Sequence, residues 1–144
     1  MSDRPAHAAP MLRVVEDVLT IGGCRVDNLV SVVGGTPFYA YDREVVAQQV
    51  RMLREALPEA LSLHYAIKAN PMPAVVEHVA SLVDGLDIAS IGEMQLALGS
   101  GTPAAAISFA GPGKRDNELE GAIAAGVTIN LESVNELSRA LRIA

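Results

Sequence analysis

Short apolar runs alternate with amphipathic segments over most of the chain, a pattern typical of a parallel β/α protein. Strands are predicted at four apolar runs: 61–67, 85–89, 105–110 and 127–131. Segments with helical periodicity follow these runs: 73–83, 90–98, 116–125 and 133–143. Strands and helices that alternate with a period of roughly 20 residues indicate βαβ crossovers. The pattern therefore predicts four consecutive βα units.

The region before these units has a different pattern. Between residues 12 and 33, short apolar runs are separated by a Gly-Gly pair and followed by a second one, which predicts two or three β segments joined by tight turns. Another short strand is predicted at Phe38–Tyr41. Asp42 should then cap a helix whose apolar residues share one face, and Pro58 should end that helix.

Two architectures fit four βα units. A doubly wound sheet can be completed with few units, whereas a closed (β/α)8 barrel needs twice as many as are present. The chain stops after the fourth unit, within the helical pattern at 142–144. If the barrel interpretation is right, the chain is half a barrel with two exposed strand edges, and such edges favour association with other chains.

Composition narrows the function classes. The only cysteine is Cys24, which excludes an internal disulfide framework and a metal site built from cysteines. A net charge of -6 without a basic cluster argues against a nucleic-acid-binding surface. Residues 1–10 predict a flexible polar leader rather than a signal peptide, and no apolar stretch is long enough to cross a membrane. We therefore expect a cytoplasmic protein with neither nucleic-acid nor membrane partners.

Lys68 is the first candidate for chemistry. It follows the apolar run at 61–67, and strand alternation places His64, Ala66 and Lys68 on one face. In (β/α)8 enzymes the catalytic groups lie at the carboxyl ends of the strands. A partly desolvated lysine at such a position is free to form an imine with a carbonyl compound. The spacing alone leaves open a plain surface lysine at a strand end.

Four motifs, in order along the chain, resemble those of the ornithine/diaminopimelate decarboxylase family, the fold-type III pyridoxal-phosphate enzymes. They are Tyr-Ala-Ile-Lys-Ala-Asn at 65–70, the segment 85–93, Phe-Ala-Gly-Pro-Gly-Lys at 109–114, and the segment 126–137. The resemblance covers nearly all of residues 36–141. The strings at 34–42, 64–73 and 109–114 are most similar to the exosortase-system-associated branch. Pro112 departs from diaminopimelate decarboxylases, which usually carry Asn there.

This resemblance implies a fold. Residues 36–144 would form the first half of an alanine-racemase-like (β/α)8 barrel of the TIM type. Residues 11–35 would be β segments that join a carboxyl-terminal β domain absent from this chain. The parent enzyme would be a homodimer, and this amino-terminal portion is expected to be inactive alone.

The resemblance also implies a site. Lys68 would hold pyridoxal 5'-phosphate as an imine, and the cofactor would accept the electrons left when an α-carboxylate departs as carbon dioxide. Ala66 would lie beside the cofactor, and Asp87 and Glu93 near the lysine. The residues alone also allow structural roles, since Ala66 is a small inward residue and Glu93 completes a capping box with Ser90. The substrate would be an amino acid or an aminoacyl group on a carrier protein.

Other functions stay open. A fold-type III racemase is one alternative, although Pro-Met-Pro at 71–73 stands where racemases of the alanine type usually carry Tyr-Gly-His. A cofactor-free aldolase and a non-catalytic remnant or interaction module are the others. His64 is expected to be a structural strand residue, and Lys114, the only other lysine, a surface charge.

Overall fold

The computed structural model describes residues 13–144 as parts of two compact units, the first ending at Gln49 and the second comprising Val50–Ala144. The division falls inside helix α2 (Arg43–Ala56). The leader predicted at residues 1–10 lies outside the described residues. Assignment of residues 11–35 to a β domain stays a prediction.

A small antiparallel sheet opens the first unit. Its strands follow the chain order β1 (Arg13–Val15), β2 (Val18–Ile21) and β3 (Cys24–Arg25). Two-residue turns join them, and all four turn residues have positive φ, at 50° and 59° in the first turn and 58° and 76° in the second. Turns of this kind match the twist of paired strands, and Gly22-Gly23 adopts one without steric cost. The predicted β segments and tight turns are confirmed here.

The prediction was wrong for two other segments of this unit. Residues Val26–Val33 form helix α1, where a β segment was expected, and Phe38–Tyr41 has no regular structure. The apolar residues of α1 recur at helical rather than alternating spacing, so its valines were given too much weight as strand formers. Gly34 ends the helix in the left-handed conformation, with φ 91° and its N–H donated to the Val30 carbonyl at 2.9 Å.

Helix α2 starts where the sequence predicted. The Asp42 carboxylate accepts the N–H of Glu44 at 2.9 Å, as an N-cap side chain does. Its other oxygen accepts the N–H of Gly22 at 2.7 Å. The pKa of Asp42 is therefore lowered, first by the Gly22 N–H and then by the helix N–H groups, against the opposing effect of burial.

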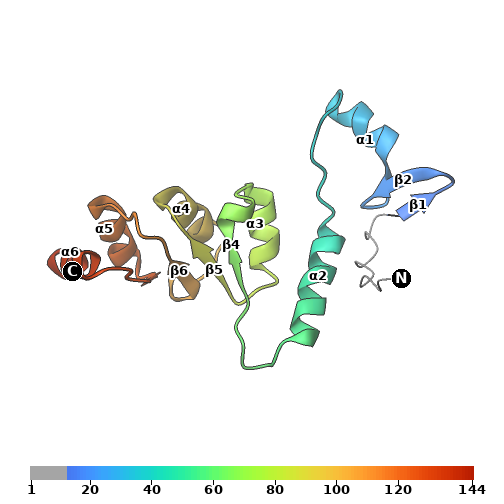
Figure 1. The fold of residues 1–144 in the computed structure, drawn as a ribbon. Helices are drawn as coiled ribbons and strands as arrows, with labels where there is room; N and C mark the ends of the chain where they lie inside the picture. The colour runs from blue at the N-terminus through green and yellow to red at the C-terminus, as the bar shows by residue number, and fades with distance from the viewer. Residues whose placement is uncertain (1–12) are drawn as a thin grey trace, which may run out of the picture. The chain divides into compact units, whose positions relative to one another are not determined.

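The second unit is a run of βα units on a four-stranded parallel sheet (Figure 1). The strands are β4 (His64–Ala66), β5 (Gly85–Ile88), β6 (Ile107–Phe109) and β7 (Thr128–Ile129). The helices are α3 (Pro73–Ala80), α4 (Ile91–Gly99), α5 (Asp116–Ala125) and α6 (Val134–Ile143), with short 3-10 turns η1 (Ile67–Ala69) and η2 (Ala104–Ala106). All four predicted units are present.

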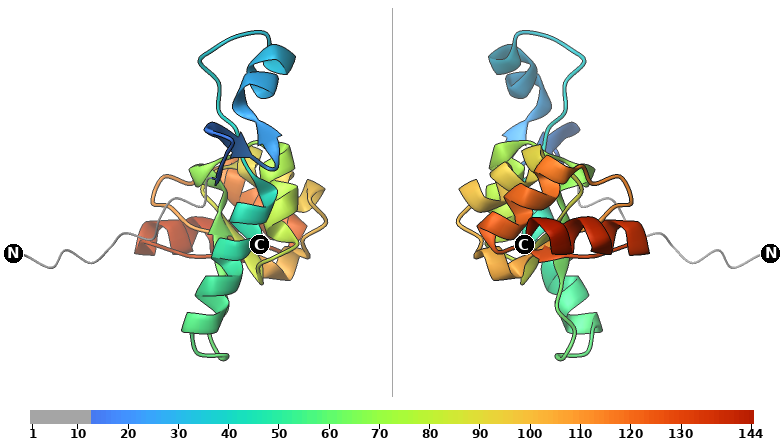
Figure 2. Two further views of the ribbon diagram at one scale, coloured as in Figure 1. Left: turned by 90° about the vertical axis from the view of Figure 1, so that its right-hand side faces the viewer. Right: turned by 90° about the vertical axis from the view of Figure 1, so that its left-hand side faces the viewer.

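Strand order decides between the two architectures. The strands pair in strict chain order, β4-β5-β6-β7, and every pairing is parallel. A doubly wound sheet reverses its strand order at a switch point, whereas a (β/α)8 barrel adds each strand beside the last. Helices α3 to α6 also follow one another in chain order (Figure 1, Figure 2). The second unit is therefore part of a (β/α)8 barrel, as the resemblance implied.

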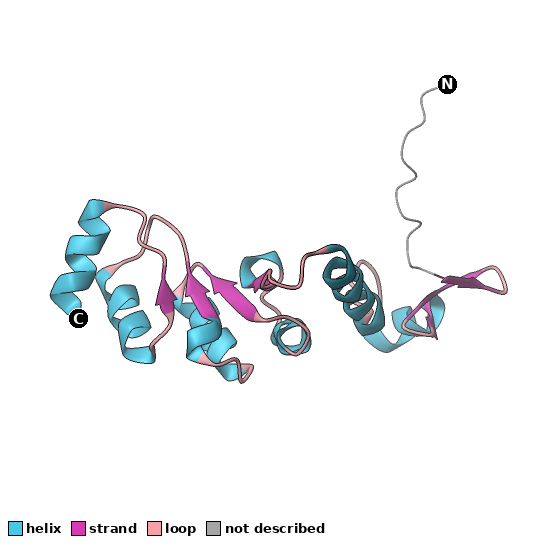
Figure 3. Cartoon of the chain, turned by 90° about the horizontal axis from the view of Figure 1, so that it is seen from below, coloured by secondary structure: helices cyan, strands magenta, loops and turns pink. Residues whose placement is uncertain are grey.

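The core lies between the sheet and its helices, which Figure 3 shows on one side of the strands. Its fully buried strand residues are Leu86, Ile88, Ile107 and Phe109, and its helix residues include Val76, Met94, Ala97 and Ala122. Successive residues of a strand point to opposite faces. The residues between these apolar positions therefore face away from the helices, toward what would be the barrel interior.

Candidate active site

A row of small and polar residues crosses the face of the sheet opposite the helices. Ala66 pairs in register with Asp87, Asp87 with Ser108, and Ser108 with Thr128. We call this row, together with His64 and Asn130 on the same side, the polar face. Because parallel strands end at one edge, the polar face runs up to the edge where barrel enzymes place their catalytic groups.

Side chains of neighbouring strands contact each other on the polar face. His64 Nδ1 lies 3.2 Å from Asp87 Oδ1, and the Asn130 amide donates to Ser108 Oγ at 2.9 Å. Sequence reasoning missed Ser108 and Thr128, and it gave His64 only a structural role. The available signal was strand alternation, which leaves Ser108 as the polar residue between Ile107 and Phe109.

Lys68 stands at the carboxyl end of β4, within turn η1. The turn is well anchored, because Ile67 is fully buried in the core and the Tyr65 hydroxyl donates to the Asn70 carbonyl at 3.1 Å. The Asn70 N–H donates back to the Ile67 carbonyl at 3.0 Å. The position of Lys68 at this strand end agrees with the prediction. Its environment does not, because the strand ends at Ala66 and the backbone turns, so that Lys68 is exposed rather than partly desolvated.

Asp87 is the carboxylate of the polar face, with its side chain 44% exposed. It lies opposite Ala66 in register, and Lys68 follows Ala66 by two residues. These three candidate residues are therefore brought to one end of two paired strands. Their roles toward a cofactor stay predictions.

Glu93 begins helix α4 instead of facing the strands. Its carboxylate accepts the Ala89 N–H at 2.7 Å, and its own N–H donates to Ser90 Oγ at 3.3 Å. These contacts satisfy N–H groups that the start of a helix leaves without partners. The capping role predicted for Glu93 is present, and a role near the lysine stays a prediction.

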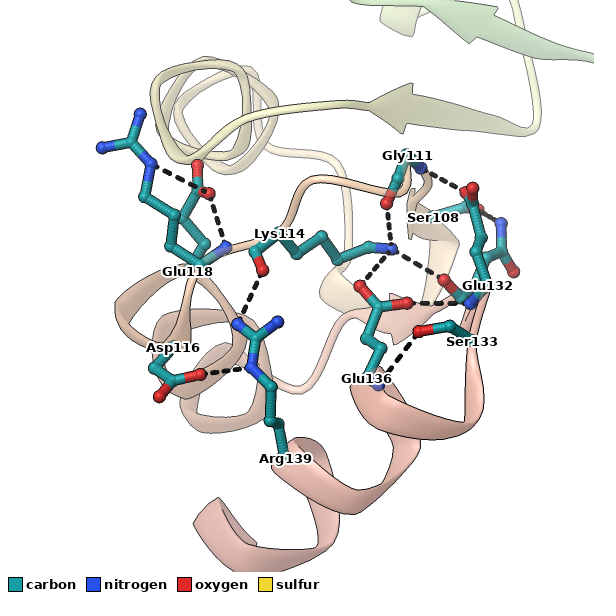
Figure 4. A network of polar contacts seen from close by, with 11 residues as sticks. Ser108, Gly111, Lys114, Asp116, Glu118, Glu132, Ser133, Glu136 and Arg139 are labelled. Carbon is teal, nitrogen blue, oxygen red and sulfur yellow. Dashed lines mark hydrogen bonds and ion pairs between the residues drawn. The ribbon is translucent and has the colours of Figure 1, made fainter.

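A buried lysine ties together the loops after β6 and β7 (Figure 4). Lys114 donates to the Gly111 carbonyl at 2.7 Å, to the Asn130 carbonyl at 2.8 Å and to Glu136 Oε1 at 3.1 Å. Its side chain is only 1% exposed, so the prediction of a surface charge was wrong. The three ammonium protons have three acceptors, which is what a buried charge requires.

Two carboxylates of this network, those of Glu132 and Glu136, also connect the loops after β6 and β7. Glu136 Oε2 accepts the Glu132 N–H at 2.8 Å, and the Glu132 carboxylate accepts the N–H of Gly111. Gly111 has φ 113°, a conformation that favours glycine. Since both its N–H and its carbonyl are engaged, Gly111 serves loop geometry, not anion binding.

Glu136 is charged in this network. Burial raises the pKa of Glu136, but the N–H of Glu132 and the ammonium of Lys114 donate to its carboxylate, and the net pKa lies below its ordinary value. Its N–H also donates to Ser133 Oγ at 3.1 Å, a capping contact at the start of α6. The network therefore fixes the edge of the sheet beside Asn130 and the polar face.

Comparison with known proteins shows to which family the chain belongs. Residues 43–144 match the family model described as pyridoxal-dependent decarboxylase, pyridoxal binding domain. The chain belongs to this family. The cofactor of the family is pyridoxal phosphate, and the match covers every strand of the parallel sheet and Lys68.

Individual relatives are decarboxylases. The chain is 38% identical over 112 residues to a diaminopimelate decarboxylase of Neisseria meningitidis and 38% identical over 103 residues to the L-glutamyl-[BtrI acyl-carrier protein] decarboxylase of Niallia circulans. These alignments cover 76% and 71% of this chain but only 28% and 24% of the relatives. The structure of diaminopimelate decarboxylase from Helicobacter pylori complexed with L-lysine superposes with a TM-score of 0.72 at 35% identity, over 81% of this chain and 30% of that one.

The described residues fit the amine half of a pyridoxal-phosphate site. An aldehyde cofactor needs an amine that it can reach, and Lys68 is exposed at the correct strand end, whereas Lys114 is enclosed. The polar face beside it carries the Asp87 carboxylate and, opposite it in register, the small side chain of Ala66. Among residues 13–144, no helix combines the length and the apolar character needed to cross a membrane.

Proposed function

We propose that this chain supplies the lysine-bearing half of the cofactor site of a pyridoxal-phosphate-dependent amino-acid decarboxylase. The observation that carries the proposal is the position of Lys68, exposed on an anchored turn at the carboxyl end of β4 and within the family match. The position of Lys68 alone would also fit an ordinary surface charge, so the proposal depends on the family match as well.

Each candidate residue has a distinct task. Lys68 binds the cofactor through its side-chain nitrogen. When bound, pyridoxal phosphate accepts the electron pair left on the α-carbon as carbon dioxide departs. Ala66 keeps the face next to Lys68 clear, Asp87 holds a negative charge beside it, and Glu93 fixes the start of α4 at the same edge.

The substrate class follows from the relatives. A free diamino acid is suggested by the diaminopimelate decarboxylase of Neisseria meningitidis, and an aminoacyl group on a carrier protein by the enzyme of Niallia circulans. Pro112, which departs from diaminopimelate decarboxylases, favours a substrate other than diaminopimelate. We also propose that the chain belongs to the exosortase-associated branch and that its parent enzyme is a homodimer. The proposed location is the reducing cytoplasm, where the exposed Cys24 would stay a thiol.

The chain alone should turn over no amino acid at a useful rate. It spans 28% of the Neisseria relative, so most of that enzyme's length has no counterpart in it. A panel of lysine, ornithine, diaminopimelate and glutamate, assayed for carbon dioxide release, should therefore give the same rate as pyridoxal phosphate without protein. Release above that rate, lost in Lys68→Ala, would show that the half-barrel is already a complete site.

Binding is the direct test. Titration of the purified chain with pyridoxal phosphate should produce the absorbance band of the lysine-bound cofactor, absent in Lys68→Ala and retained in Arg142→Met, a change at a side chain that is 70% exposed. The pyridoxal phosphate concentration for half-saturation of the chain should be at least about tenfold lower than that for a peptide copying residues 65–70. This ratio corresponds to a binding free energy more favourable by roughly 1.4 kcal/mol. Equal bands in wild type and Lys68→Ala, or half-saturation no lower than that of the peptide, would overturn the proposal.

A further inference from the structure

The imidazole of His64 is aimed at the carboxylate of Asp87 on the polar face. His64 Nδ1 and Asp87 Oδ1 are 3.2 Å apart, on neighbouring strands β4 and β5. An ionised carboxylate can only accept hydrogen bonds, so Nδ1 must carry the proton of this contact. The two side chains are 32% and 44% exposed, so their mutual attraction alone would hold them only weakly.

A second feature fixes the ring. Gly85 lies opposite His64 in register, and a Cβ placed on Gly85 would clash with the Ala106 carbonyl oxygen and would also come within 2.6 Å of His64 Cε1 and 2.8 Å of Nε2. The imidazole therefore occupies the space that any other residue at position 85 would fill with its side chain. The absence of a side chain at Gly85 leaves room for the ring beside β5, with Nδ1 at 3.2 Å from Asp87 Oδ1.

Other charges near the ring are already engaged. Asp84, which precedes β5, pairs with Arg54 at 2.6 Å and accepts the Leu63 N–H at 2.6 Å. These contacts lower the pKa of Asp84, with only a minor contribution from His64. The specific acceptor of the His64 ring is therefore Asp87.

His64 lies deeper in the sheet than Asp87. Lys68 is at the carboxyl end of β4, Ala66 pairs with Asp87, and His64 stands two residues before Ala66. His64 thus contacts Asp87 from the side remote from the reacting edge. We propose that His64 is a positioning residue: it holds the Asp87 carboxylate through Nδ1–H, so that the carboxylate presents a fixed negative charge to the end of the sheet that carries Lys68. This inference rests on the proposed function of Lys68 and adds a residue to it.

The contact itself can be tested without cofactor. Long-range proton–nitrogen correlation spectra of the histidine-labelled chain report which ring nitrogen carries the proton when the ring is neutral. His64 should be protonated at Nδ1 in wild type and return to the commoner Nε2–H form in Asp87→Ala, because the hydrogen bond selects the tautomer. His78, on helix α3, is the internal reference and should not change. A His64 ring protonated at Nε2 in wild type would overturn the inference.

The positioning role is tested by cofactor capture. His64→Leu removes the donor and should raise the pyridoxal phosphate concentration for half-saturation on the order of threefold to tenfold, as Asp87→Ala does. His64→Asn keeps an N–H donor near the Nδ1 position and should restore most of the wild-type value, while His78→Asn should not alter it. The double variant His64→Leu/Asp87→Ala should be no weaker than Asp87→Ala alone, since both changes remove one contact.

The outcomes separate the two proposals. Capture by His64→Leu equal to wild type, or additive losses in the double variant, would remove His64 from the site while leaving Lys68 in place. Failure of wild type to capture the cofactor at Lys68 would instead overturn the proposed function. The ring-nitrogen spectrum would then decide by itself whether His64 holds Asp87.

Discussion

At the scale of single residues, the two lysines of this chain occupy opposite environments. Lys68 is exposed at a strand end, whereas Lys114 is enclosed by two carbonyls and a carboxylate. Motif and position predicted the place of Lys68 correctly. The burial of Lys114 could not be predicted, because two of its three acceptors come from a loop 16 residues away and a helix 22 residues away in the chain.

Removing the Lys114 charge should destabilise the second unit strongly. In Lys114→Met, Glu136 would remain buried without its cation, so we expect a loss of about 3–5 kcal/mol in the free energy of unfolding, measured by urea denaturation. Lys114→Met/Glu136→Gln should recover part of this loss, since it leaves no unpaired charge. Arg142→Met, at a side chain 70% exposed, is the matched control and should change stability by less than about 0.5 kcal/mol. A loss of control size in Lys114→Met would contradict the buried network.

The same network predicts a pH dependence. The pKa of Glu136 is lower in the folded chain than its ordinary value, so its stabilising contribution is fully present above about pH 4.5 and is lost as pH falls through the lowered folded value. Urea midpoints measured from neutral pH downward should fall more steeply in wild type than in Lys114→Met/Glu136→Gln. Parallel acid profiles for the two proteins would show that Glu136 does not contribute.

At the scale of elements, local signals predicted the βα units well. Ser90 and Ser133 start α4 and α6 by accepting helix N–H groups, and Gly126 ends α5 with φ 75°. These signals work because a cap is satisfied within a few residues of chain. Helix α1 was missed because its valines were given too much weight as strand formers, although its apolar residues recur at helical spacing. Strand lengths were overestimated because the pairing partner on the neighbouring strand decides where each strand ends.

Two glycines should respond to alanine in opposite directions. Gly126 has φ 75°, so Gly126→Ala should lower the free energy of unfolding by about 1 kcal/mol through backbone strain. Gly99 is the last residue of α4, and nothing lies within 4 Å of the position that a Cβ would take, so Gly99→Ala should raise the free energy of unfolding by roughly 0.5 kcal/mol. Thermal or urea unfolding of both variants provides the comparison, and a shift of the same sign in both would contradict the assigned helix ends.

At the scale of the whole molecule, sequence pattern identified a parallel β/α protein but left two architectures open. Only strand order, which depends on long-range pairing, showed the sequential β4-β5-β6-β7 arrangement of a barrel. The polar face also depends on long-range strand pairing. The register of the strands brings Ala66, Asp87 and Ser108 into one row, and no local signal in the sequence aligns residues so far apart. Family motifs predicted Lys68 and Asp87, whereas the His64 contact required the structure.

The central claim is that this half-barrel presents Lys68 as the cofactor lysine. The most direct measurement is borohydride reduction of the chain with pyridoxal phosphate, followed by peptide mapping of the labelled nitrogen in folded and urea-unfolded samples. Of the two lysines, we predict label on Lys68 alone in the folded chain and on both after unfolding, because unfolding exposes the enclosed ammonium of Lys114. Label on Lys114 in the folded chain, or none on Lys68, would contradict the account.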